Sequence, residues 1–341
     1  MTTTSPGNLT AVLTDSPTTP AHRRRVALVA ILVIAWIAGS SLGTLGPTAP
    51  RANAWPMFEL QQAHVGYVPT LDGSSPIFIL FLGSDARPGQ TISGQRADSI
   101  HLVAINPSTH KVSILGFPRD SWVPIPGNGS NKLNASMVDG GPELTVQTVE
   151  ELTGIKIDYW ALTWFDGFKA MVNDVGGLTV DVPFAMSDPS YSGAEFQPGV
   201  QTLDGREALA FARNRHDLPT GDFGRSEDQG LLMTSALAQF NKEFTKDPSR
   251  LFKWVGAGLR NVRTDVPMDQ LMSLAFTSTA LNLKKAQNMV LPGSTATVNG
   301  TSIVALDEAA LAAISNDLKD DGYVTKKNVP PSPNAPLTGG D

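Results

Sequence analysis

The sequence IFILFLGSDAR, residues 77–87, carries the clearest indication of the architecture of this chain. Its first part, residues 77–82, is an unbroken apolar run of strand length and predicts a buried β-strand. Directly after this run the chain becomes polar and carries Asp85 and Arg87. Because open α/β sheets bind ligands beyond the ends of their strands, the change from apolar to polar predicts a binding site at one edge of a sheet.

Segments with strand and helix patterns alternate after this first strand. Their alternation predicts a mixed α/β domain with a central mixed β-sheet and helices on both faces. Further strands are expected at residues 99–105, 112–117, 158–164, 178–182 and 287–291, and helices at residues 142–153, 166–172, 204–213, 225–244, 248–259, 269–281 and 307–318.

Length and composition limit the class of protein. The chain has 341 residues, of which 41% are hydrophobic and 17% charged, which is enough for one large domain. A net charge of −6 argues against a general nucleic-acid binder, and the absence of cysteine excludes disulfides, thiolate metal sites and cysteine nucleophiles. From the placement of proline, we expect a linker at residues 47–75, the globular domain at 76–324 and a disordered tail at 325–341.

The N-terminal part has the pattern of a membrane anchor. Residues 26–46 carry no charge and are long enough to cross a hydrocarbon core of roughly 30 Å as one transmembrane helix. Arginines at 23–25 precede this span, so the positive-inside rule places a disordered tail, residues 1–25, in the cytoplasm and the domain outside. Two alternatives stay open, which are a signal peptide cleaved near residues 52–54 (Ala-Asn-Ala) and a buried core helix.

Two acidic residues flank the loop after the first strand. Asp85 follows that strand, and Asp98 directly precedes the next expected strand. Strands that neighbour each other bring such residues together, so both carboxylates can approach one hard cation. Oxygen ligands that leave room for water suit Mg²⁺, the ion that proteins usually share with phosphate oxygens.

Basic residues accompany these acids at the expected strand ends. The planar fork of arginine matches phosphate oxygens, so many arginines in an acidic protein predict a phosphate-binding site. For each residue alone, a surface ion pair is the alternative. His216 is either an exposed loop residue or a base. Arg213 and Arg215 can point to the same side only if their segment is extended, and they diverge if it ends a helix. The candidate cations are Arg87, Arg96, Arg119, Lys132, Arg213, Arg215 and Arg225.

At these residues the sequence resembles the LytR–CpsA–Psr family. The resemblance runs in order over residues 76–245, and the combination of motifs makes it specific although each motif alone is weak. The matching stretches are LGSDAR (82–87), RADS (96–99), FPRDSWVPIP (117–126), NKLNAS (131–136), GG (140–141), VEELTGIKIDYW (149–160), DVGGLTVDV (174–182), PGVQTLDGREALAFARNR (198–215) and GDFGR (221–225) with Gln229.

The resemblance implies an enzyme of cell-wall assembly. Family members take a glycopolymer, such as teichoic acid, capsule or arabinogalactan, from a polyprenyl-pyrophosphate carrier in the membrane lipid. They transfer it with its phosphate to a peptidoglycan hydroxyl. The implied topology is single-pass in the cell membrane, with the N-terminus cytoplasmic and the catalytic domain, residues 76–324, extracytoplasmic. The implied cofactor is Mg²⁺, with Mn²⁺ as an alternative.

The resemblance also implies a role for each matching residue. Asp85 or Asp120 is the expected base that takes the proton of the acceptor hydroxyl. The implied roles are Mg²⁺ ligands for Asp85 and Asp98, catalysis for Asp85, Arg119 and Asp120, pyrophosphate binding for Arg119, Arg213, Arg215 and Arg225, a neutral donor for Gln229, and support of the site for Arg87, Arg96 and Lys132.

One position departs from the family pattern. The family has R-x-x-R-Q where this chain reads RSEDQ at residues 225–229, so Asp228 stands in place of a second arginine. If Asp228 faces the phosphates, we expect weaker pyrophosphate binding, because a like charge replaces a cation. Two other functions stay open: a non-catalytic membrane protein that binds polyprenyl phosphate or wall polymer, and a polyprenyl pyrophosphatase that uses water as acceptor.

Overall fold

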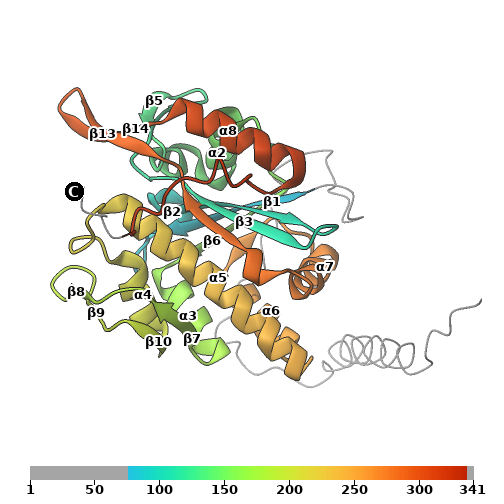
Figure 1. Ribbon diagram of the computed structural model, residues 1–341. Helices are drawn as coiled ribbons and strands as arrows, with labels where there is room; N and C mark the ends of the chain where they lie inside the picture. Colours follow the sequence, from blue (N-terminus) through green and yellow to red (C-terminus); the bar gives the residue numbers. More distant parts are fainter. Residues whose placement is uncertain (1–75, 336–341) are drawn as a thin grey trace, which may run out of the picture. The chain divides into compact units, whose positions relative to one another are not determined.

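The structure is a computed structural model, and it describes residues 76–335 (Figure 1). The expected cytoplasmic tail, transmembrane helix and linker, residues 1–75, lie outside the described residues, as does the end of the tail at residues 336–341. Within residues 76–335, no helix has both the length and the apolar character that crossing a bilayer requires.

A six-stranded sheet forms the centre of the domain, in the order β11-β6-β1-β2-β3-β12. Its strands are β1 (Ile77–Ser84), β2 (Ala97–Asn106), β3 (Lys111–Gly116), β6 (Tyr159–Trp164), β11 (Arg263–Thr264) and β12 (Gln287–Val290). β1 is antiparallel to β2 and parallel to β6, and β3 is antiparallel to β2 and parallel to β12. Strands β1, β3, β6 and β12 therefore end at one edge, where β2 begins. We call it the carboxyl edge.

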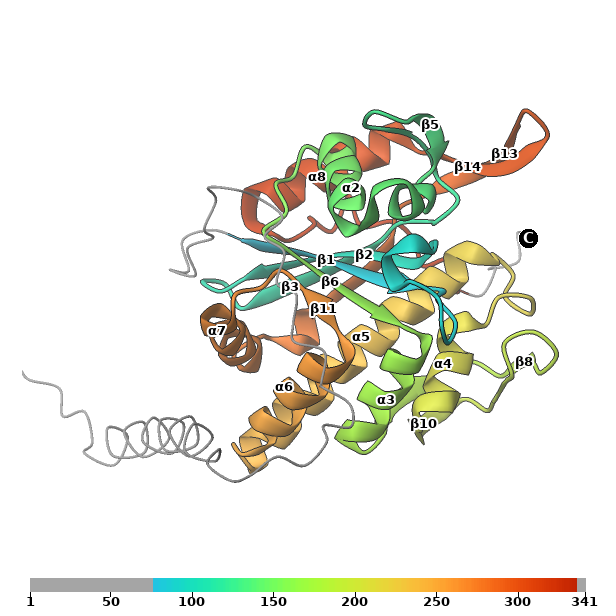
Figure 2. The same ribbon diagram turned by 180° about the vertical axis from the view of Figure 1, so that it is seen from behind.

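Helices cover both faces of this sheet, as the sequence predicted (Figures 1 and 2). On β1, Phe78 and Leu80 join the core beneath α2 and α8, whereas Ile77 and Ile79 join the core on the opposite face, which includes residues of α5 and α7. A strand covered on both faces needs apolar residues at every position, which explains the unbroken run at 77–82. The covering helices are α2 (Ala135–Thr153) and α8 (Glu308–Asp321) on one face, and α3 (Phe165–Val175), α5 (Asp222–Lys246), α6 (Arg250–Asn261) and α7 (Met268–Thr279) on the other.

A second, smaller core lies beside the sheet and includes Val180, Phe196 and Phe211. It is built by α3, α4 and α5 with two small antiparallel sheets, β7–β10 and β8–β9. Most of these short strands were not predicted, because three to five residues carry little periodicity. The remaining elements are β4 (Trp122–Ile125), β5 (Gly129–Lys132), β7 (Leu178–Val182), β8 (Met186–Asp188), β9 (Ala194–Phe196), β10 (Gly199–Leu203), α4 (Gly205–Arg213), β13 (Gly293–Val298), β14 (Thr301–Leu306), η1 (Ile92–Gly94) and η2 (Leu283–Lys285).

Helix α2 is longer than the helix predicted at residues 142–153. It begins at Ala135 and contains a kink, because Gly140 and Gly141 have non-helical backbone angles, with φ of +71° at Gly141. Pro142 follows this kink and starts the second helical part. Proline is favoured at the first position of a helix, so the predicted helix began at Pro142. The first helical part, before the kink, was not predicted.

The C-terminal segment differs from the disordered tail expected at residues 325–341. Residues 325–335 are described and contact the start of α5. The side chain of Asn334 donates to the backbone oxygen of Gly224 and to Asp228 Oδ1, both at 3.0 Å, and Ser332 Oγ donates to Glu227 Oε2 at 2.7 Å. The segment has no apolar face, so its sequence predicted a disordered tail. Polar hydrogen bonds hold it instead.

Candidate functional site

The loop between β1 and β2 brings Asp85 and Asp98 to the carboxyl edge. The strands lie close together there, since a Cβ atom at Gly83 would come within 2.9 Å of Ser99 Cβ. Their register shifts between Gly83 and Ser84, which is a β-bulge of the kind that redirects side chains near functional sites. The backbone N–H of Asp85 then donates to the oxygen of Arg96 at 3.1 Å and closes the loop.

The two carboxylates influence each other. Burial raises the pKa of Asp85, and the charge of Asp98 raises it further, whereas Arg119 and Arg96 act in the opposite direction. Asp85 Oδ1 is buried and accepts no hydrogen bond. Among residues 76–335 no group of three or more histidines, cysteines and acids is placed to hold a metal. The two carboxylates, with the unpartnered Oδ1 of Asp85, offer oxygen donors of the kind that suits Mg²⁺, which commonly keeps water and substrate oxygens as its other ligands.

Arg119, just after β3, connects these acids to α5. Its guanidinium forms an ion pair with Asp98, and its Nε lies 3.5 Å from Asp222 Oδ1. Burial by itself would lower the pKa of Arg119, but Asp98 and Asp222 more than offset this and raise it. The half-buried side chain is therefore held as a cation between two carboxylates.

Asp222, in the first turn of α5, is the centre of the site. Arg225 Nη2 lies 2.6 Å from Asp222 Oδ1, and Arg215 Nη1 lies 4.0 Å from the same oxygen. Arg225 is only 8% exposed, and burial lowers its pKa while Asp222 opposes that shift. We call Arg119, Arg215 and Arg225 the arginine cluster. The sequence motif GDFGR contains Asp222, but the motif alone did not mark it as a site residue.

Several polar atoms in this region are buried without a hydrogen bond. Native proteins satisfy nearly all such atoms, so a group of them at one place indicates a site prepared for a ligand. This distinguishes the arginine cluster from a set of surface ion pairs. The atoms are Asp85 Oδ1, Asp222 Oδ2, Arg225 Nε and both amide atoms of Asn214.

The start of α5 is fixed by close contacts with the sheet. A Cβ atom at Gly116 would lie 2.3 Å from Ser226 Oγ, so glycine is needed for this approach. The fully buried His101 of β2 hydrogen-bonds the oxygen of Ser226 at 3.0 Å through Nε2. Burial lowers the pKa of His101 to about 4, so the ring is neutral and its Nε2–H donates. These contacts hold Asp222 and Arg225 at the carboxyl edge.

The other predicted cations, Lys132, Arg96 and Arg87, lie outside the arginine cluster and have different contacts. Lys132 Nζ lies 3.1 Å from Asp120 Oδ1, so these residues form a pair directly beside Arg119 in the chain. Arg96 acts on Asp85 through its charge. Arg87 is exposed, and its backbone N–H donates to Gln90.

Arg213 and Arg215 separate at the end of α4. Arg213 is the last residue of that helix, and its guanidinium lies over the ring of Phe165, 5.1 Å from the ring centre. Arg215 instead contacts Asp222. The amide of Gln229 donates to the oxygen of Ala212 at 3.0 Å, so it holds this segment against α5. The structure thus places Arg215, and not Arg213, in the arginine cluster.

Asp228 is buried against the C-terminal segment. It is 1% exposed and accepts a hydrogen bond from Asn334. Burial raises its pKa to about 8, and the charges of Glu227 and Asp217 add to this shift. The departure from the family pattern therefore contacts the C-terminal segment.

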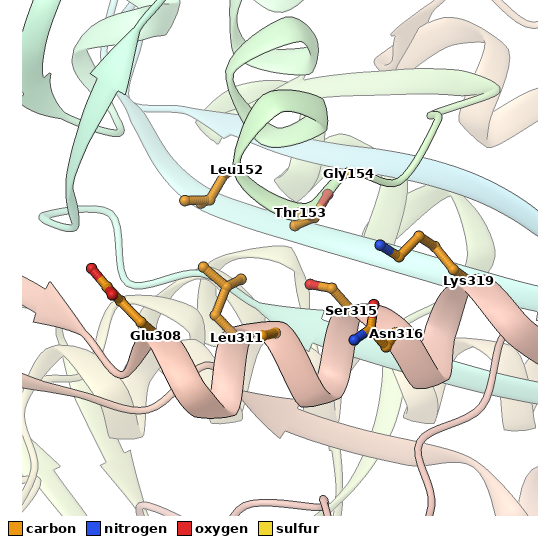
Figure 3. A pocket seen from close by; sticks show the side chains of 9 residues that line it. Leu152, Thr153, Gly154, Glu308, Leu311, Ser315, Asn316 and Lys319 are labelled. Atoms are coloured by element: carbon orange, nitrogen blue, oxygen red, sulfur yellow. The ribbon is translucent and has the colours of Figure 1, made fainter.

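A separate cavity of about 270 Å³ lies between the C-terminal end of α2 and helix α8 (Figure 3). Leu152 and Leu311 form its apolar part, and Lys319 lies at one end. It shares no lining residue with the arginine cluster.

Fold and site together define an α/β domain with an arginine-rich, carboxylate-lined site at the carboxyl edge of its sheet. The chain belongs to the LytR_cpsA_psr family, whose model matches residues 57–320. It is 31% identical over 259 residues to the polyisoprenyl-teichoic acid–peptidoglycan teichoic acid transferase TagU of Bacillus subtilis strain 168, covering 74% of this chain and 79% of that protein.

Solved structures agree with this assignment. The crystal structure of B. subtilis TagV has a TM-score of 0.64 and 31% identity, covering 74% of this chain and 98% of that one. A structure of TagT bound to LI-WTA has a TM-score of 0.62 and 26% identity, covering 77% of this chain and 98% of that one. The expected α/β architecture and family are confirmed.

Proposed function

We propose that this chain is an extracytoplasmic phosphotransferase of cell-wall assembly. It moves a glycopolymer, with its phosphate, from a polyprenyl-pyrophosphate carrier to a hydroxyl of peptidoglycan. The observation that carries the proposal is the arginine cluster around Asp222, with its unsatisfied polar atoms, beside the pair Asp85 and Asp98. The relatives named as teichoic acid–peptidoglycan transferases support the same reaction class.

The arginine cluster would bind the pyrophosphate and neutralise the charge that develops during transfer. Phosphoryl transfer needs positioning and charge stabilisation more than covalent help from the protein. Arg225 is buried and fixed, and Arg119 is held between two acids, so both guanidiniums are oriented before the substrate arrives. Arg215 is 37% exposed and can meet the phosphate from the solvent side.

Asp85 and Asp98 are the residues that would hold Mg²⁺. When bound, the ion would neutralise phosphate oxygens and weaken the bond to the leaving group. The free oxygen of Asp85 supports this role. Asp98 already pairs with Arg119, so it would link the cation to the arginine cluster.

Residues 26–46 would anchor the domain in the membrane as a single-pass helix, with the N-terminus in the cytoplasm. This topology keeps the site close to a carrier dissolved in the same bilayer.

The test is transfer of a labelled glycan from a synthetic polyprenyl pyrophosphate to peptidoglycan by the full chain in detergent or vesicles. Arg119→Ala and Asp98→Ala should each lower turnover by about two orders of magnitude or more, because each removes charge stabilisation of the transition state. The matched controls are Arg206→Ala and Asp181→Ala, which change exposed residues. Unchanged turnover in both site variants would refute the proposal.

The same assay separates the alternatives. Tight binding of the carrier without any product over hours would indicate a non-catalytic binding protein. Label released into solution, with none on peptidoglycan, would indicate a polyprenyl pyrophosphatase.

A further inference from the structure

The hairpin β8–β9 and the loop after α4 form a cluster outside the arginine cluster. His216 Nδ1 lies 3.3 Å from Asp188 Oδ2, and the ring of Tyr191 stacks on the His216 ring with centres 3.9 Å apart. Asp188 is 3% exposed at its side chain, whereas His216 is 42% exposed. A buried carboxylate thus holds an accessible imidazole in a fixed orientation.

The contacts of His216 define which nitrogen carries its proton. Burial would raise the pKa of Asp188, but its hydrogen bonds with His216 and Ser192 lower the pKa overall, so the carboxylate is ionised. An ionised carboxylate only accepts, so His216 Nδ1 must donate to it. Nε2 then carries the lone pair, and this lone pair accepts a hydrogen bond from Arg215 Nη2 at 3.4 Å. This tautomer is the one in which Nε2 accepts a proton.

Arg215 connects this imidazole to the arginine cluster. Its Nη1 lies 4.0 Å from Asp222, while its Nη2 lies 3.4 Å from His216. A phosphate bound by Arg215 would therefore contact the same guanidinium that contacts His216 Nε2. An oxygen that attacks this phosphate from the solvent side would come within reach of His216 Nε2.

The charged and titratable groups around His216 come from two elements. Asp188 and Tyr191 face it from the hairpin, and Arg215 and Asp217 adjoin it in the loop. Asp217 Oδ2 accepts from the backbone N–H of Ser187 at 2.5 Å, so this acid helps to hold the hairpin against the loop.

The two bases considered from the sequence are engaged elsewhere. Asp120 pairs with Lys132, and Asp85 faces Asp98 and Arg96 at the candidate cation site. His216 is an exposed imidazole that a buried carboxylate orients, with its Nε2 beside a cation of the arginine cluster.

We propose that His216 is the general base of the transfer reaction, with Asp188 as its positioning residue; this rests on the proposed function. The acceptor hydroxyl gives its proton to His216 Nε2, and its oxygen forms the new bond to phosphorus. The bond from that phosphorus to the bridging oxygen breaks, and the electron pair leaves with polyprenyl phosphate. His216 later releases the proton to water. No further reactant is needed.

The test uses the full chain, the synthetic carrier and a soluble peptidoglycan oligosaccharide. His216→Asn keeps a donor for Asp188 but has no base, so transfer should fall by about 10²–10⁴-fold. The carrier dissociation constant, measured separately, should stay within about threefold because the arginine cluster is intact. The wild-type rate should fall at acid pH, and this fall should be absent in His216→Asn. His110→Asn is the matched control, because His110 is an exposed histidine at a left-handed position that asparagine tolerates.

Chemical rescue distinguishes a base from a structural residue. Added imidazole should restore part of the transfer by His216→Ala, and should not stimulate Arg119→Ala. Wild-type rate and pH profile in His216→Asn would overturn the proposal, as would a slow variant with the wild-type pH profile and no rescue by imidazole. Absence of transfer by the wild-type chain would refute the proposed function itself, and the base role with it.

Discussion

Arg225 and Asp222 form an ion pair within the first turns of α5, with 2.6 Å between Nη2 and Oδ1. Both side chains are mostly buried, at 8% and 15% exposure. Removing charged groups from water is costly, so such a pair persists only where each partner compensates the other. Here Asp222 also compensates Arg119 and Arg215, and it thereby allows three cations to converge at the carboxyl edge.

This arrangement predicts a large loss of stability in Asp222→Ala. The substitution leaves Arg225 buried without its partner and the arginine cluster without its central acid. We expect the free energy of unfolding to fall by about 3 kcal/mol, which is the lower end of the loss found when a buried ion pair loses one partner. Urea unfolding of the full chain measures it, and Asp181→Ala, at an exposed position of β7, should change stability by less than about 0.5 kcal/mol. Equal losses in both variants would contradict the role of Asp222.

The carboxyl edge could be predicted from sequence because strand ends are local features. The strand at 77–82 and the polar residues after it placed Asp85, Asp98 and Arg119 at the correct edge. Asp222 could not be selected in this way, since its importance comes from contacts with residues far apart in the chain. Only the folded structure shows that Arg119 and Arg215 converge on it.

The orientation of individual side chains was less accessible to sequence reasoning. The pattern allowed Arg213 and Arg215 either to align or to separate, and the helix end of α4 separates them. Position 228 was considered beside the phosphates because of its place in the motif. Asp228 lies three residues after Arg225 and so on nearly the same side of α5, and its burial against Asn334 depends on a C-terminal segment with no apolar pattern.

Asp228 predicts a pH-dependent stability. Its pKa is raised from 3.8 to about 8 in the folded chain. Between these values the folded state binds more protons than the unfolded state, so stability falls as pH rises from about 4 to about 8. Asp228→Asn keeps the acceptor for Asn334 but cannot ionise. We expect it to melt at a higher temperature than wild type at pH 9, and the advantage to shrink toward pH 5.

Thermal unfolding across this pH range provides the measurement. Glu195→Gln, which changes an exposed acid of β9, serves as the control and should show no comparable trend. A constant difference between Asp228→Asn and wild type from pH 5 to pH 9 would mean that Asp228 is ionised throughout.

The contact between the C-terminal segment and α5 predicts opposite effects at two helical glycines. At Gly224 a Cβ atom would lie 2.3 Å from Asn334 Oδ1, whereas at Gly258 of α6 it would meet no atom within 4 Å. Alanine favours a helix over glycine by about 0.5–1 kcal/mol, so Gly258→Ala should stabilise the chain. Gly224→Ala should instead displace Asn334, lose about 1 kcal/mol net, and make residues 325–335 more sensitive to proteolysis. A similar gain in both variants, with unchanged proteolysis, would show that the segment does not pack there.

The pair Asp85 and Asp98 predicts the metal dependence of transfer. With few protein ligands, each carboxylate contributes much of the affinity for Mg²⁺. Asp85→Asn keeps the shape of the side chain but removes one charge, so we expect the Mg²⁺ concentration for half-maximal transfer to rise about tenfold or more. Chelation by EDTA should stop transfer by the wild-type chain, and added Mg²⁺ should restore it. Asp181→Asn, an exposed aspartate of β7, should keep the wild-type Mg²⁺ dependence. Full transfer in EDTA, or an Asp85→Asn variant with unchanged Mg²⁺ dependence, would show that these acids do not bind the metal and only compensate the charges of the arginines.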